Sequence, residues 1–195
     1  LHLCNKNMVK MDTNNDSKAK HNLLVDVCMA ANYEAQSLIR YHDKYKQSNE
    51  DSKICTVLAR SFADIGDIVR GKDPFYGNTQ ESAQREQLES KLKEIFKKIH
   101  DEVTKRNNEL KTRYQKDGGD YYKLREDWWN ANRETVWEAM TCSKELDNSS
   151  YFHATCNDTG KGPSQTHNKC RCEKKGGGNV NVVPTYFDYV PQFLR

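Results

Sequence analysis

Seven cysteines spread along a very polar chain place the strongest constraint on what this sequence can fold into. Only 35% of the 195 residues are apolar, so a core made from hydrophobic side chains alone would be small. Disulfides are the usual extra stabilisation of such chains in an oxidising compartment, and each native bridge contributes about 2–4 kcal/mol. The cysteines are Cys4, Cys28, Cys55, Cys142, Cys156, Cys170 and Cys172.

We expect all seven to serve in disulfides, with a pairing that the sequence leaves open. Because seven is an odd number, one cysteine needs a partner outside these 195 residues. The alternative is one free, reactive thiol.

The charge balance excludes one class of partner. The chain has 31 basic and 28 acidic residues, a net charge of +3. A nucleic-acid-binding domain is usually clearly basic, so we expect no nucleic-acid partner. No apolar run reaches the roughly 18 residues of a membrane span, and we see no signal peptide. We therefore expect no membrane insertion by this stretch, and any anchor must lie outside it.

Apolar residues at helical spacing predict an all-α bundle as the core, spanning residues 22–141. A polar, irregular lead-in over residues 1–21 precedes it. The run ARSFADIGDIVRGKDP at Ala59–Pro74 reads as a helix end that Gly71 closes and Pro74 stops. The expected helices cover residues 22–45, 52–70, 81–115 and 121–141.

The rest of the chain, after residue 141, has a different character. Residues 142–183 are polar, turn-prone and rich in cysteine, which predicts a long irregular loop stapled by disulfides. Residues 184–195 begin with Pro184 and are rich in aromatic side chains, so we expect the next helix to start there.

Catalytic and metal motifs are missing from the sequence. It has no HExxH pattern, no GxSxG turn, no Walker-type glycine loop and no dinucleotide fingerprint. We therefore expect no catalytic residue, no cofactor and no enzyme. A zinc site in the tail is an alternative to disulfides there, although the Cys170-x-Cys172 spacing is tighter than zinc sites usually have. Its ligands would come from His153, Cys156, His167, Cys170 and Cys172.

Two basic clusters are candidates for binding a sulfated glycan by charge. The first is in the loop, where a scaffold could present it to a partner. The second lies along the expected helix 81–115, but a solvated face paired with Glu94, Glu102 and Glu109 is the preferred interpretation there. The candidates are Lys169, Arg171, Lys174 and Lys175 in the loop and Lys91, Lys98, Lys105 and Lys116 on the helix.

Three blocks of the sequence resemble one family almost letter for letter. They are ARSFADIGDIVRGKDP, WWNANRETVWEAMTC from Trp128 and VPTYFDYVPQFLR from Val183. Shorter matches are LHLC at Leu1, LLVDVCMAANYEAQSL at Leu23 and KCRC at Lys169. In this order they resemble the Duffy-binding-like domain, alpha class, of Plasmodium falciparum erythrocyte membrane protein 1.

This resemblance implies a disulfide-stapled helical adhesion module on the surface of the infected red cell. A distant membrane segment of the larger protein would anchor it, and variable surface segments, here residues 79–123 and 143–167, would support antigenic variation. Alpha-class domains are linked to rosetting through complement receptor, blood-group sugars or heparan sulfate. The implied partners are host red-cell or endothelial receptors, a sulfated glycosaminoglycan or blood-group sugar, antibodies and neighbouring domains. The alternative function is a spacer domain without direct ligand contact.

Overall fold

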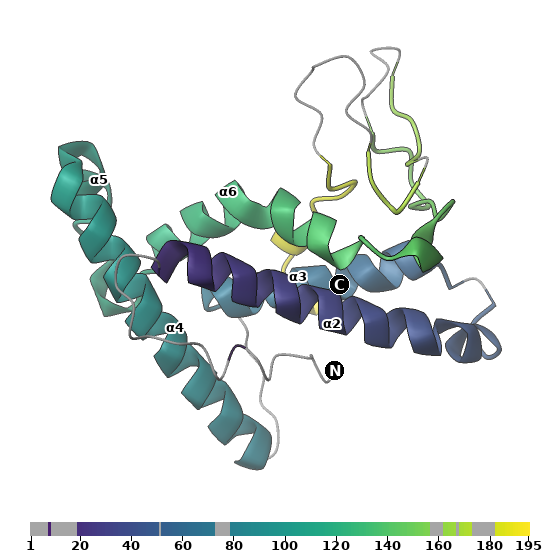
Figure 1. Ribbon diagram of the computed structural model, residues 1–195, viewed down its shortest axis with the longest axis horizontal. Coiled ribbons are helices and arrows are strands. Elements are labelled where there is room, and N and C mark those ends of the chain that lie inside the picture. Colours follow the sequence, from purple (N-terminus) through teal and green to yellow (C-terminus); the bar gives the residue numbers. More distant parts are fainter. Residues whose placement is uncertain are drawn as a thin grey trace.

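The structure is a computed structural model, and it describes residues 8, 19–50, 52–72, 79–156, 162–166, 168–172 and 182–195. Within these residues the fold is all-α, as predicted, and the extended pairing consists of two isolated β-bridges. The three helices α2, α3 and α6 lie against one another, and α4 runs at an angle to them toward α5 (Figure 1). The helix bounds are α2 Ala19–Lys46, α3 Ile54–Arg70, α4 Thr79–Arg106, α5 Asn108–Arg113 and α6 Tyr122–Met140.

Helix α3 is the centre of the bundle. Twelve of its 17 residues are buried, in agreement with the small number of charges in its sequence. Gly71 ends the helix with φ at +70°, and its N–H and that of Lys72 donate to the carbonyls of Ile68 and Asp67. This is the left-handed helix cap for which glycine is best suited, so the predicted stop at Gly71 is confirmed. Pro74 lies outside the described residues.

Aromatic rings fill the space between α3 and α6. The ring of Phe62 on α3 lies 5.1 Å from both Trp129 and Trp137, measured between centroids. At Gly66 a Cβ atom would lie 2.8 Å from carbons of the Trp129 indole. The two helices therefore approach so closely that α3 has no room for a side chain at this position.

A buried carboxylate joins the C-terminal segment to α6. Asp188 is 1% exposed and accepts two hydrogen bonds from Arg133, at 2.9 and 2.7 Å. The indole N–H of Trp129 donates to the same carboxylate at 2.9 Å. Three donors therefore compensate the loss of water around this charge, as a buried carboxylate requires.

A second pair of charges joins the same segment to α3. Arg70 is 2% exposed and donates to the Asp67 carboxylate at 2.8 Å and to the backbone carbonyl of Asp188. Arg195 pairs with Asp67 and, at 3.3 Å, with Asp64. Burial raises the pKa of Asp67, while the positive charges of Arg195 and Arg70 oppose that rise. The three sequence blocks that carry the family resemblance thus meet in one buried charge network.

Three predicted elements differ from the structure. The expected helix 81–115 is interrupted at Asn107, whose extended backbone lets its side chain accept from the N–H groups of Glu109 and Leu110. Asparagine forms such caps readily, and they start the new helix α5.

The expected helix within residues 184–195 is replaced by two 3₁₀ turns, η4 Phe187–Tyr189 and η5 Gln192–Leu194. Pro191 lies between them, and proline both lacks an N–H and disfavours a helical conformation at the residue before it. At the other end of the bundle, α2 starts at Ala19, inside the expected lead-in.

No helix in the described ranges is both long and apolar enough to cross a membrane.

Replacing Asp188 with alanine should destabilise the domain by about 3–5 kcal/mol, because Arg133 would stay buried without its counter-charge. The matched control is Asp120→Ala, which removes a half-exposed carboxylate that pairs with Lys93, and should cost about 1 kcal/mol or less. Urea unfolding of both variants measures the difference. Equal losses of stability would contradict the buried network.

Candidate functional site: a disulfide-stapled face beside the start of α3

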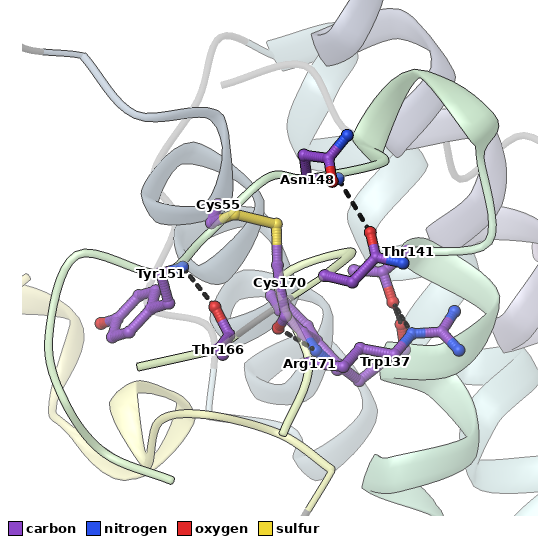
Figure 2. The surroundings of a disulfide bond; sticks show 9 residues. Cys55, Trp137, Thr141, Asn148, Tyr151, Thr166, Cys170 and Arg171 are labelled. Carbon is purple, nitrogen blue, oxygen red and sulfur yellow. Dashed lines mark hydrogen bonds between the residues drawn. A yellow bond between two sulfur atoms is a disulfide. The ribbon is translucent and has the colours of Figure 1, made fainter. Parts of the chain in front are cut away.

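One disulfide fixes the cysteine-rich loop to the first turn of α3. It joins Cys55 to Cys170 across 115 residues, with 5.5 Å between their Cα atoms, and both cysteines are fully buried. Trp137 of α6 donates its indole N–H to the Cys170 carbonyl at 3.1 Å (Figure 2). The loop is therefore held by α3 through sulfur and by α6 through a hydrogen bond.

A second disulfide shapes the loop itself. Cys156 and Cys172 are joined across 16 residues, and Cys156 also forms a β-bridge with Ser164, with hydrogen bonds of 2.8 and 2.7 Å. Tyr151 donates its N–H to the Thr166 hydroxyl at 2.6 Å, as Figure 2 shows. These cross-links order an otherwise irregular segment.

The other cysteines differ from the expectation that all seven are bonded. Cys28 and Cys142 are free thiols, and Cys4 lies outside the described residues. The Cys28 sulfur lies 3.9 Å from the Thr135 carbonyl oxygen, whereas that of Cys142 lies 3.0 Å from the Asn32 amide, one turn further along α2. The Cys28 thiol on α2 therefore contacts α6, and the Cys142 thiol, which follows α6, contacts α2.

The zinc alternative is left without its sulfur ligands. Cys156, Cys170 and Cys172 are all in disulfides. His153 lies with its ring centroid 3.8 Å from that of Phe152, and His167 lies outside the described residues. Within the described residues no group of three potential metal ligands is present.

Two of the basic loop candidates form hydrogen bonds with the C-terminal end of α6. Arg171 donates to the Thr141 hydroxyl at 2.6 Å and to the Glu138 carbonyl at 2.5 Å. Lys169 donates to the Cys142 carbonyl at 3.3 Å. Positive charges that bind the last carbonyls of a helix stabilise its C-terminus. Burial lowers the pKa of Arg171, which is consistent with a side chain turned inward. Lys174 and Lys175 lie outside the described residues.

The lysine row on the long helix is only partly assembled. Lys91, Lys98 and Lys105 lie on α4, where Lys91 approaches Glu94 at 3.8 Å. Lys116 follows α5, beyond the break at Asn107, so the continuous helical row that the sequence suggested is not formed.

This face contains a cleft that sequence reasoning missed. It has a volume of about 720 Å³ and lies between the end of α2, the start of α3 and the stapled loop. Tyr45 and Phe152 line it with rings that are 50% and 48% exposed, and Lys53 and Arg60 line it with exposed positive charges. Tyr45, Lys53 and Arg60 come from neighbouring segments, but Phe152 comes from the stapled loop, so no local motif could have predicted the cleft.

The cleft combines two kinds of contact. Exposed aromatic rings offer flat apolar faces for stacking, and cations attract acidic groups of a ligand. Neither Lys53 nor Arg60 forms an ion pair with any acidic residue in the described part of the chain. Asn49 at the rim donates its side-chain amide to the Tyr45 carbonyl at 3.2 Å, which orders the end of α2. Glu50 adds one negative charge to the lining.

These features define a class of protein: a disulfide-bonded helical domain that presents a stapled polar face. The family model described as the Duffy binding domain matches residues 1–195, and the chain belongs to that family.

The solved structures give a closer comparison. The NTS-DBL1(alpha-1) domain of P. falciparum membrane protein 1 (PfEMP1) from the varO strain is 38% identical to this chain, with a TM-score of 0.72. The NTS-DBL1-alpha and CIDR-gamma double domain of the same P. falciparum strain is 38% identical, with a TM-score of 0.73. Both alignments cover 99% of this chain, which spans 40% and 25% of the two longer chains. No curated protein sequence matches the chain. The resemblance to alpha-class Duffy-binding-like domains is confirmed.

Removal of the two disulfides should have unequal effects. In the chain-entropy account, a bridge that closes about 115 residues contributes roughly 4–5 kcal/mol, and one that closes 16 residues contributes about 3 kcal/mol. The double variant Cys55→Ala with Cys170→Ala should therefore lose more stability than Cys156→Ala with Cys172→Ala, as measured by urea unfolding. The opposite order would contradict the structural role given to the longer bridge.

Proposed function

We propose that this domain is an extracellular adhesion module of a larger, membrane-anchored parasite antigen on the infected red cell. It binds host-cell receptors or glycans, and binding rather than catalysis is its activity. Membership of the Duffy binding domain family and the similarity to PfEMP1 domains support this proposal. Two disulfides in the fold support a location outside the cytoplasm.

The observation that carries the binding proposal is the cleft beside α3. Tyr45 and Phe152 offer exposed rings, and Lys53 and Arg60 are exposed cations that lack an acidic partner among the described residues. A sulfated glycan carries both flat sugar faces and repeated negative charges, so it matches this lining. Lys174 and Lys175, which closely follow Cys172 in the sequence, add two further positive charges to this segment of the chain.

The alternative function is a spacer that holds neighbouring domains of the adhesin apart and makes no host contact. The use of Lys169 and Arg171 at the end of α6 favours it for that part of the surface, because side chains engaged in capping are less available to a ligand.

Chromatography on immobilised heparin tests the proposal with three matched variants, each of which replaces two positive charges with two negative ones. The cleft variant is Lys53→Glu with Arg60→Glu, the loop variant is Lys174→Glu with Lys175→Glu, and the α4 variant is Lys98→Glu with Lys105→Glu. The unaltered domain should bind at low salt and elute as salt rises, because the attraction is electrostatic.

The cleft and loop variants should elute at clearly lower salt, and the α4 variant should elute close to the unaltered domain. Equal shifts in all three would indicate a response to net charge alone and would contradict the assignment to this face. Passage of the unaltered domain through the column at low salt would favour the spacer function.

A further inference from the structure

A pocket at the C-terminal end of α3 has a shape that one buried side chain fixes. Its volume is about 520 Å³, and residues from the end of α3, the first half of α4 and the start of α6 line it. The Arg125 guanidinium on α6 is fully buried and joins these three elements. It donates to the carbonyls of Val69 and Ile68 at 2.7 and 3.1 Å, and to the two carboxylate oxygens of Glu89 at 2.6 and 2.8 Å. The walls are therefore in place before any ligand binds.

The lining combines an apolar base with an aromatic ring. Ile68, Leu88 and Leu92 form the base and are 7%, 2% and 0% exposed. The ring is that of Tyr122, which is 50% exposed. At Gly71 a Cβ atom would lie 2.9 Å from this ring, so the glycine lets the tyrosine lie directly against the end of α3. Such a lining suits a ligand group with a long methylene stem and a cationic head.

The charges of the pocket leave one carboxylate without a partner. Four charged residues line it, and Glu89 is one of them. Lys93 pairs with Asp120 at 2.6 Å, and Arg85 is also engaged within the structure. Glu86 is exposed and forms no ion pair with any residue in the described part of the chain. The uncompensated charge of the pocket is therefore negative, and it attracts a cation.

An arginine side chain matches each part of this lining. Its methylene stem would cover the apolar base, and its guanidinium would donate to the Glu86 carboxylate beside the Tyr122 ring. Arginine is also enriched among the residues that dominate protein interfaces. A sulfated glycan does not match, because its negative charges would meet the Glu86 carboxylate.

We propose that the pocket between α3, α4 and α6 binds an arginine side chain of a protein partner. It is a second contact site, separate from the cleft proposed to bind a glycan. The two sites lie at opposite ends of α3, since Lys53 precedes the helix and Gly71 ends it.

Titration of the chain with the peptide acetyl-Ala-Arg-Ala-amide, followed by saturation-transfer NMR, tests this proposal. The peptide should bind with a dissociation constant of about 1 mM, as expected for a ligand of this size. The same peptide with citrulline, which has the shape of arginine but no charge, should bind roughly fivefold more weakly. Glu86→Gln should weaken binding of the arginine peptide by a similar factor, and Tyr122→Leu should weaken it about threefold.

Glu102→Gln is the matched control, because Glu102 is exposed on the same helix and lies outside the lining. It should leave the affinity unchanged. An equal loss in both glutamine variants would indicate a response to net charge alone and would overturn the proposal. Equal affinity of the two peptides would also overturn it, as would the absence of saturable binding up to about 20 mM.

Two further probes distinguish a protein partner from a small cation. Free arginine carries a carboxylate that Glu86 repels, and spermidine has no planar head group, so both should bind more weakly than the peptide. Equal or tighter binding of either would overturn the assignment to a protein side chain. The variant Lys53→Glu with Arg60→Glu should leave peptide binding unchanged, so a failure of the glycan proposal does not affect this test.

Discussion

The disulfide between Cys55 and Cys170 is the constraint on which the organisation of the molecule depends. It ties the irregular segment after α6 to the first turn of α3, the most buried part of the bundle. Apart from this bond, two hydrogen bonds hold Cys170: the Trp137 indole N–H donates to its carbonyl, and its own N–H donates to the Ser149 carbonyl. With the disulfide in place, Phe152 of the loop and Lys53 of the α3 start line the same cleft. The face proposed to bind ligands thus depends on a covalent bond.

Buried charges provide a second constraint, which holds the C-terminal segment against α3 and α6. Asp188 receives hydrogen bonds from Arg133 and Trp129, and Arg70 reaches the Asp188 backbone. Only 35% of the residues are apolar. These contacts therefore hold the C-terminal segment against the core, a role that additional hydrophobic side chains would otherwise have to fill. Such networks depend strongly on geometry, because a missing partner leaves an uncompensated buried charge. Side chains of exposed segments have no comparable need for a fixed partner. The surface sequence can therefore change while the buried framework stays the same.

Sequence periodicity predicted the helices well where one apolar face dominates. The end of α3 at Gly71 and the buried tryptophans of α6 followed from local rules, because a glycine cap and a helical stripe are encoded by neighbouring residues. The break at Asn107 was missed because a side-chain cap competes with helix continuation at a single residue. The C-terminal turns were missed because aromatic content suggested a helix while Pro191 prevents one.

The candidate site was harder to predict than the fold. Arg171 and Lys169 were predicted as glycan-binding candidates, and their hydrogen bonds to the end of α6 were not foreseen, because they depend on the disulfide pairing, which spacing alone left open. The cleft has the same origin, since Tyr45, Arg60 and Phe152 are neighbours only in the folded chain. Contacts between distant segments carry no local pattern, and this is the physical limit of the sequence argument.

Mapping of disulfides in the unreduced protein, by proteolysis and mass spectrometry, tests the central claim most directly. The account predicts one linked peptide pair that contains Cys55 and Cys170 and another that contains Cys156 and Cys172. A bond from Cys170 to any other cysteine, or a free thiol at Cys55, would detach the loop from α3 and contradict the account.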